Sequence, residues 1–196
     1  MKQLLCFMLF TVLFSCNSST PIDVTQIDTH EMVTILPNLK NPLIKDSIVL
    51  STPIEFKIDI KSSKVSYITW NYIVNGKSLY DDTFDYQVYN KQNKMQPISR
   101  LDNSDLKNTK TINIILKERN HLVSKKDAEQ LLKKYLITKS LDSLKFGDTI
   151  KLTTYNKFKK ENSKMIMDLR KVNDSIIFKV TRGEKYFFYL DKKINW

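Results

Sequence analysis

The stretch Ile54-Glu55-Phe56-Lys57-Ile58-Asp59-Ile60 places a large apolar residue at every second position and a charged residue between each pair. Successive side chains of a β-strand point to opposite faces, so this alternation predicts a strand with one face in a core and the other in water. The stretch 66–74 is rich in aromatic and β-branched residues and ends at Asn75-Gly76. Because both turn residues tolerate the positive φ angles of a type I′ turn, we expect a β-hairpin here.

Two further strands are expected at 84–89 and 111–117, separated by the polar, loop-like segment 90–110. Several short strands without helices predict that residues 44–118 form a β-rich region. This pattern is similar in outline to the antiparallel sandwich of immunoglobulin-like modules, in which Trp70 would be the buried aromatic residue of the core.

The hydrophobic period changes in the C-terminal region, 119–196. Ser124 and Asp127 resemble a helix capping box, and apolar residues then recur at helical spacing, so a helix is expected at 125–138. A second helix is expected at 155–172. The remaining elements are expected to be strands, at 149–153, 175–181 and 184–190, the last two forming a C-terminal hairpin. This region is therefore α+β, with two helices and a hairpin, and the fold class of the whole chain is α+β.

Residues 16–43 are polar, rich in Ser, Thr and Asn, and contain Pro21, Pro37 and Pro42. This composition predicts a tether that holds the folded part away from its attachment point, with a short strand at 32–36.

The N-terminal segment 1–16 combines a lysine, a short apolar run and a cysteine. The run has about eleven residues, which suits a signal peptide and falls well short of the roughly 20 that span a bilayer. It ends at Leu13-Phe14-Ser15-Cys16, which resembles the lipobox of bacterial lipoprotein precursors, although Phe14 is bulkier than the residue usual at its position. The resemblance implies that 1–15 is a signal peptide and that Cys16 is acylated and becomes the mature N-terminus.

Two other interpretations of this segment stay open. One is an ordinary secretory signal with an incidental cysteine, and the other is a hydrophobic N-terminus on a cytosolic chain.

A lipoprotein would contact the membrane through its acyl chains, in which each buried CH₂ group contributes ~0.8 kcal/mol. Asn17 follows the cysteine, where enterobacterial lipoproteins retained at the inner membrane carry aspartate, so the resemblance favours the outer membrane, facing the periplasm. Cys6 lies in the leader and Cys16 would carry lipid, so no thiol would remain to form a disulfide.

The formal net charge is +11. The lysines are scattered through every segment among Asp and Glu residues and form no arginine-rich run, so we expect no nucleic-acid partner. A surface solvated by lysines is the favoured interpretation, and attraction to anionic envelope components is the alternative.

The residues that enzymes and cofactor sites commonly need are scarce. Gly76, Gly147 and Gly183 are the only glycines, and each falls in an expected turn, so no phosphate-binding loop is predicted. His30 lies in the expected tether, and His121 is expected to be a solvent-facing structural residue. Neither a nucleophilic triad nor a zinc site is therefore predicted, no cofactor is expected, and no catalytic pair can be chosen.

Asp81, Asp82 and Asp85 match the aspartate-rich pattern of isoprenoid synthases. In that family the pattern lies on a helix, whereas here it lies between expected strands. A solvated turn is therefore expected, with a loop calcium site as the alternative.

Tyr186, Tyr189 and Trp196 form the candidate binding surface, because the strand 184–190 alternates aromatic rings toward both faces. Exposed rings can stack on a glycan or a protein, while Phe188 is expected to point inward. We therefore interpret the chain as a non-enzymatic envelope lipoprotein, a binding or accessory domain for a protein or an envelope polymer. A small envelope hydrolase that uses a carboxylate pair is the alternative.

Overall fold

The computed structural model describes residues 20–40, 46–81, 84–183 and 186–196. The leader, Cys16 and Asp82 lie outside the described residues. The described chain is mostly antiparallel sheet with several short helices, which confirms a β-rich α+β fold.

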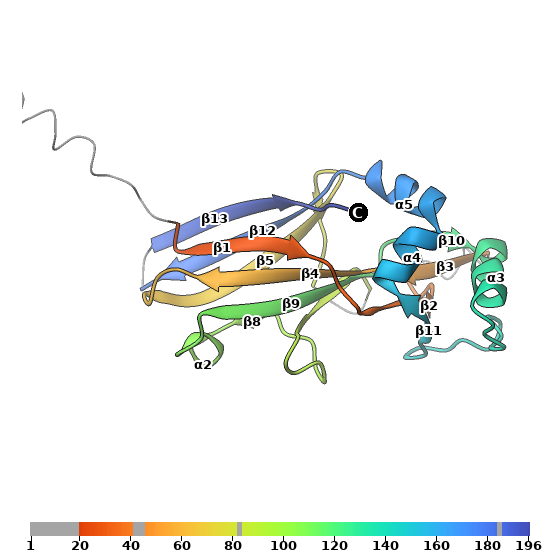
Figure 1. Cartoon of the computed structure of the whole chain (residues 1–196), viewed down its shortest axis with the longest axis horizontal. Coiled ribbons are helices and arrows are strands. Elements are labelled where there is room, and N and C mark those ends of the chain that lie inside the picture. The colour runs from red at the N-terminus through yellow and green to blue at the C-terminus, as the bar shows by residue number, and fades with distance from the viewer. Residues whose placement is uncertain (1–19, 41–45, 82–83, 184–185) are drawn as a thin grey trace, which may run out of the picture.

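Two antiparallel sheets form the larger part of the molecule (Figure 1). The first sheet contains, in spatial order, β1 (Ile22–Ile27), β4 (Pro53–Ile60), β9 (Thr111–Glu118) and β7 (Tyr86–Asn90). The second contains β13 (Tyr186–Lys193), β12 (Asp174–Arg182), β5 (Val65–Val74) and β6 (Lys77–Ser78), with β8 (Arg100–Leu101) also paired to β5.

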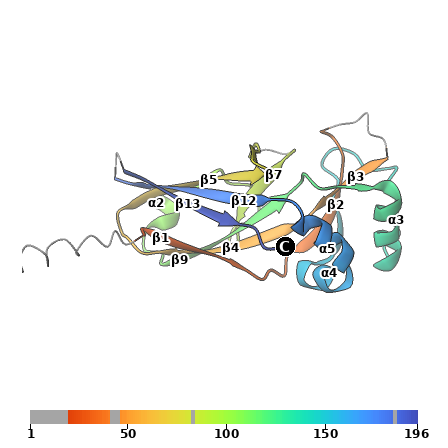
Figure 2. The ribbon, with the colours of Figure 1, turned by 90° about the horizontal axis from the view of Figure 1, so that it is seen from above.

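The two sheets pack face to face, and Figure 2 shows them as separate layers. Phe56 on β4 meets Phe178 on β12 edge to face, with ring centroids 5.7 Å apart. Tyr72 on β5 meets Tyr86 on β7 in the same way, at 5.6 Å. Trp70 is 6% exposed, so its expected place in the core is confirmed. Apolar burial between the layers therefore stabilises this part of the molecule.

The two expected hairpins are both present. Asn75 and Gly76 have φ angles of 48° and 78° between β5 and β6, which is the conformation expected of a type I′ turn. Strands β12 and β13 pair from Ser175 opposite Lys193 to Arg182 opposite Tyr186, as the C-terminal hairpin.

A third sheet and most of the helices form the other end of the molecule (Figure 1). The sheet contains, in order, β10 (Leu122–Ser124), β3 (Ser47–Ser51), β2 (Met32–Pro37) and β11 (Ile150–Thr154). The helices are α3 (Lys125–Lys134), α4 (Tyr155–Glu161) and α5 (Ser163–Arg170) at this end, and α2 (Asn103–Leu106) beside the sandwich.

Helix α3 begins as the sequence predicts, because the Ser124 side chain accepts a hydrogen bond from the Asp127 backbone N–H. It ends four residues early because Leu136 adopts a positive φ of 55°. The prediction of a single helix at 155–172 is wrong, since Asn162 divides α4 from α5. Its side-chain amide donates hydrogen bonds to Tyr135 Oη and to the Phe158 carbonyl, which hold the backbone out of helical geometry.

The prediction that residues 16–43 form a tether is also wrong for most of that segment. Ile22 and Val24 are 1% exposed, and β1 pairs with β4 along its whole length. Strand β2, the short strand expected at 32–36, buries Val33 and Ile35 between β3 and β11. Apolar residues alternate with polar ones at the start of β1, and β2 is apolar except at Thr34, so each strand has a face for the core although residues 16–43 as a whole are polar.

The expected boundary near residue 118 does not separate the sheets. Strand β5 from the N-terminal region pairs with β12 from the C-terminal region. Only Thr52 separates β3 from β4, and residues 119–121 connect β9 to β10. The strands therefore run from the sandwich directly into the third sheet, and the junction between these parts is built from adjoining strand ends.

Replacing Phe178 with Ala should lower the free energy of unfolding by about 3–5 kcal/mol, because it leaves a cavity opposite Phe56. Phe187→Ala on the same hairpin is the control, since Phe187 is 48% exposed and its loss should cost less than about 1 kcal/mol. Chemical denaturation of both variants measures the difference. Equal losses would mean that the two sheets do not depend on this contact.

Candidate functional site

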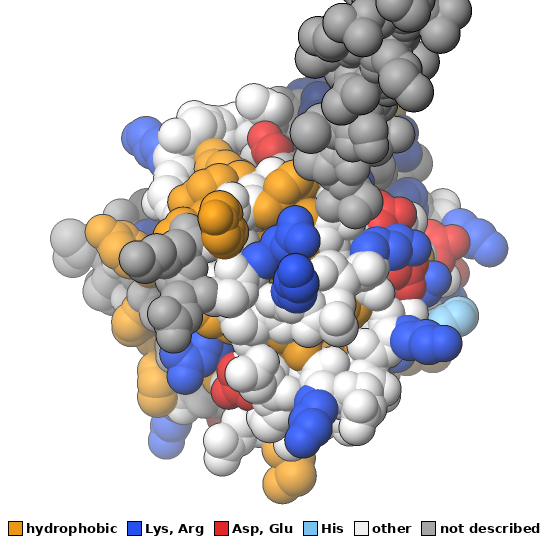
Figure 3. Space-filling view, turned by 90° about the vertical axis from the view of Figure 1, so that its left-hand side faces the viewer, with side chains coloured by type: hydrophobic (Ala, Val, Ile, Leu, Met, Phe, Trp, Pro, Cys, Tyr) orange, Lys and Arg blue, Asp and Glu red, His pale blue; other side chains and the backbone are white. Residues whose placement is uncertain are grey.

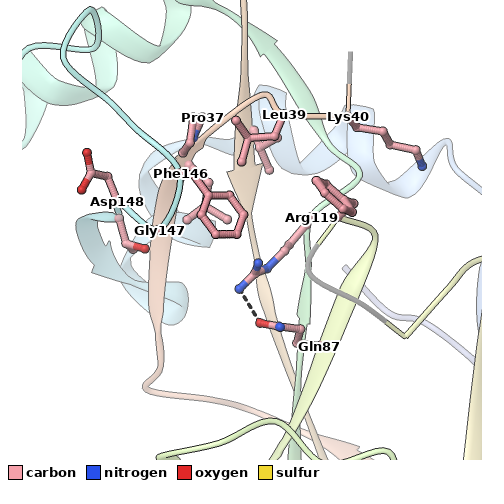
Figure 4. Close-up of a pocket in the computed structure, with 12 residues that line it drawn as sticks. Pro37, Leu39, Lys40, Gln87, Arg119, Phe146, Gly147 and Asp148 are labelled. Carbon is pink, nitrogen blue, oxygen red and sulfur yellow. Dashed lines mark hydrogen bonds between the residues drawn. The ribbon is translucent and has the colours of Figure 1, made fainter. Parts of the chain in front are cut away.

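A pocket of about 200 Å³ lies at the junction between the sandwich and the third sheet. Its walls come from the end of β2, from β3, from β7, from the residue after β9 and from the loop before β11. The lining residues are Leu36, Pro37, Leu39, Lys40, Val49, Phe84, Gln87, Arg119, Phe146, Gly147, Asp148 and Thr149. We call this the junction pocket (Figure 4).

One wall is a tight turn that the sequence predicts at Phe146-Gly147-Asp148. The Lys145 backbone N–H donates to the Asp148 carboxylate at 2.8 Å, and Gly147 adopts a φ of 88°. This φ lies in the region that favours glycine. The turn leaves Phe146 69% exposed beside the pocket, with its ring drawn near Pro37 in Figure 4.

The opposite wall carries positive charge. Arg119 Nη2 donates a hydrogen bond to Gln87 Oε1 at 2.5 Å, and the Arg119 backbone N–H donates to the Asp85 carbonyl at 2.9 Å. Lys40 Nζ forms an ion pair with the Asp85 carboxylate and lies 3.5 Å from Asn120 Oδ1. An apolar group that also carries a negative charge or a carbonyl oxygen would therefore match both walls.

The described lining of the junction pocket offers a single carboxylate. Of the described residues that line the pocket, Asp148 is the only one with a carboxylate, and none is His, Cys or Ser. A carboxylate-based hydrolase needs two such groups on either side of the bond that it cleaves. The junction pocket presents one.

Glu118 and Asp174 are two of the four buried carboxylates among the described residues, and neither lines this pocket. Glu118 and Asp174 are 1% and 2% exposed. Glu118 accepts a hydrogen bond from the Asn120 backbone N–H, and Asp174 accepts from Tyr72 Oη at 3.1 Å and Trp196 Nε1 at 3.2 Å. Burial raises the pKa of Glu118 to about 8, with a further contribution from the Asp174 carboxylate. Burial also raises the pKa of Asp174, against these two hydrogen bonds.

The solvent exposure expected of His121 and of Trp196 is wrong. Trp196 is 3% exposed, so it cannot belong to a binding surface: its indole N–H donates to Asp174, and its backbone oxygen accepts from Arg170 Nε at 2.9 Å. His121 is half-buried and stacks on Trp196, with ring centroids 6.1 Å apart. Burial lowers the pKa of His121 to about 4. These contacts join segments far apart in the sequence, so no local sequence pattern predicts them.

Tyr186 and Tyr189 are 77% and 61% exposed on β13. They lie on opposite faces of the strand and do not line the junction pocket. The structure therefore does not gather the three residues of the expected surface into one site.

The aspartate-rich segment is only partly solvated. Asp85, expected in a solvated turn, is instead 3% exposed and accepts hydrogen bonds from the Tyr80 backbone N–H and from Lys40. Asp81 accepts from Trp70 Nε1 at 3.3 Å. Within the described part of the chain, no three His, Cys, Asp or Glu side chains converge as metal ligands.

Sequence reasoning missed Lys40 and Arg119 as pocket residues. They stand far apart in the chain and no motif connects them. The sequence feature that marked one wall of the pocket was the turn at 146–148, which places an aromatic residue beside a glycine.

Comparison of the chain with family models, with curated proteins and with solved structures gives no match. Among the helices of the described residues, none has the length and apolar character needed to cross a membrane.

The pKa of Glu118 predicts how stability depends on pH. Glu118 keeps its proton up to about pH 8 in the folded protein and only up to 4.5 in the unfolded chain, so the free energy of unfolding falls as pH rises between these values. His121, with a pKa of about 4 when folded and 6.5 when unfolded, acts in the opposite sense up to pH 6.5. Between pH 6.5 and 8 we expect a net loss of about 2 kcal/mol.

Urea denaturation at a series of pH values measures this loss. The Glu118→Gln variant should show a much flatter dependence above pH 6.5, because Gln cannot ionise. Glu129→Gln, on the exposed face of α3, should keep the slope of the unmodified protein. The assignment fails if Glu118→Gln has that same slope.

Proposed function

We propose that this chain is a lipid-anchored lipoprotein of the bacterial cell envelope, held at Cys16 and facing the periplasm from the outer membrane. The lipobox-like stretch Leu13-Phe14-Ser15-Cys16 supports this proposal. The folded part acts as a non-enzymatic binding or accessory domain. We also propose that its sandwich is immunoglobulin-like, supported by two facing antiparallel sheets with Trp70 in the core.

The proposal that the folded part binds a partner is based on the junction pocket. Its volume of about 200 Å³ is below the range of about 300–1,000 Å³ that holds a whole small-molecule ligand. A single apolar side chain or terminal group of a larger partner suits it better. Such a group would rest against Leu39 and Phe146, while a carboxylate or carbonyl beside it would face Arg119. The partner is therefore a protein or an envelope polymer, and no cofactor is needed.

The alternative is a small envelope hydrolase. The raised pKa of Glu118, close to the Asp174 carboxylate, is the observation that favours it. Both groups, however, are buried and hydrogen-bonded to the protein's own backbone and side chains, and neither lines the junction pocket. A structural role for this pair is the better explanation.

Replacing Cys16 with Ser should release the protein from the membrane fraction, because the acyl chains would have no attachment point. Cys6→Ser is the matched control and should stay anchored, since Cys6 leaves with the leader. Cell fractionation and the intact mass of the mature protein are the measurements. An unacylated parent protein that stays in the membrane would contradict the lipoprotein assignment.

A photoreactive phenylalanine analogue at position 146 should crosslink the partner in intact cells, because this exposed ring borders the pocket. The same analogue at Met167, which is 54% exposed on α5, is the control and should not capture it. Adding Arg119→Gln should weaken the crosslink severalfold by removing a charge from the opposite wall. Mass spectrometry of the crosslinked products identifies the captured partner. Identical products from positions 146 and 167 would argue against the junction pocket as the binding site.

A further inference from the structure

The chain enters the sandwich very close to the proposed anchor. Pro21 is buried, its carbonyl accepts a hydrogen bond from the Lys61 backbone N–H at 2.9 Å, and Ile22 pairs with Ile60. Only five residue steps connect Cys16 to Pro21. A chain extends by at most about 3.6 Å per residue, so these two residues lie within about 18 Å of each other. An anchor at Cys16 would keep this end of the sandwich at the bilayer surface.

The same end carries a group of exposed lysines. Lys61 and Lys64 lie in the β4–β5 turn, and Lys107 and Lys110 lie between α2 and β9. In Figure 1 the start of β1, this turn and α2 share the left-hand end of the molecule. Figure 3 looks onto that end and shows basic side chains at its centre, beside hydrophobic ones. We call these four lysines the basic end.

Three of the nearby carboxylates, Asp102, Asp105 and Asp59, are engaged in local structure, while Asp23, opposite Asp59 in the β1–β4 pair, is exposed. Asp102 accepts hydrogen bonds from Ser104, and Asp105 accepts from the Asp102 backbone N–H, which together cap α2. Asp59 accepts from Thr111 Oγ1 at 2.6 Å and pairs with Lys57. The four lysines are exposed in the turns and loops at this end. They outnumber Asp23, so the net charge of these five side chains is positive.

Three of the lysines surround a hollow of about 810 Å³. Lys61, Lys107 and Lys110 line it together with Ile60, Val65 and Leu106, which supply apolar surface. The Ile60 backbone N–H donates to the Lys110 carbonyl at 2.8 Å, so the two lysine-bearing segments are tied to each other. Ammonium groups beside apolar surface match a phosphate attached to glycerol and its first methylene groups.

We infer that the basic end binds the anionic phospholipid headgroups of the bilayer that carries the anchor. This inference rests on the proposed lipoprotein function. Each lysine close to an anionic bilayer strengthens attachment by about fivefold. An acyl anchor and a basic surface together also fix the orientation of the protein. The third sheet, whose strands β2 and β3 help to line the junction pocket, then lies at the end away from the bilayer, where a partner can reach it (Figure 1).

Lysine acetylation tests the inference. The full chain, purified from bacterial membranes, is reconstituted into vesicles of phosphatidylcholine alone or of phosphatidylcholine and phosphatidylglycerol in equal parts. Mass spectrometry then measures the acetylation rate of each lysine. Acetylation of Lys61, Lys107 and Lys110 should be about fivefold slower on the anionic vesicles. Lys126 and Lys133 on α3, at the opposite end, serve as internal controls and should react equally in both.

A charge variant and a free anion complete the test. Lys107→Gln with Lys110→Gln should abolish most of the protection of Lys61 on anionic vesicles, whereas Lys126→Gln with Lys133→Gln should leave it unchanged. Protection by inorganic phosphate on neutral vesicles would overturn the inference in favour of a soluble anion, and equal rates on both vesicles would overturn it outright. The intact mass reports acylation of Cys16 separately, so failure of the anchor and failure of the basic end are distinguishable.

Discussion

The apolar face of β4 is the constraint on which the rest of the structure depends. Ile54, Phe56 and Ile58 are 2% exposed or less, and this burial requires both a facing sheet and two flanking strands. Strand β12 supplies the facing ring, and β1 and β9 supply the flanks. Because β1 must pair with β4, the N-terminal chain is drawn into the sandwich instead of forming a tether. The place where the chain leaves the sandwich toward Cys16 follows from that pairing.

The junction between the sandwich and the third sheet has a different character. Strand ends converge there, and several of them carry charged residues. Three of these residues are at most 3% exposed, namely Glu118, Asp174 and Asp85. Hydrogen bonds from Tyr72, Trp196 and the backbone compensate part of the cost of burial. The raised pKa of Glu118 shows that this compensation is incomplete. Arg119 follows Glu118 directly and reaches the junction pocket instead.

Much of the local structure follows from short patterns that need no distant partner. The strand at 54–60, the Asn75-Gly76 turn and the cap at Ser124 each depend on neighbours in the chain, and each is present in the structure. The charged face of that strand is not wholly in water as expected, because Glu55 is 0% exposed and accepts hydrogen bonds from Lys91 and Asn113. The strand at 22–27 was missed because its polar composition hides a two-residue period. The break at Asn162 was missed because its cause is a hydrogen bond to Tyr135 on another segment.

The sequence by itself determined the β-rich α+β class, both hairpins and the start of the first long helix, because backbone geometry and hydrophobic period act within a few residues. It also carried the lipobox-like stretch that ends at Cys16. Only the tertiary structure decided that Trp196 is buried, that Lys40 and Arg119 share one pocket, and that four lysines meet where the chain enters the sandwich. Those outcomes depend on which strands pair and which faces pack, and contacts between distant residues leave no local pattern in the chain.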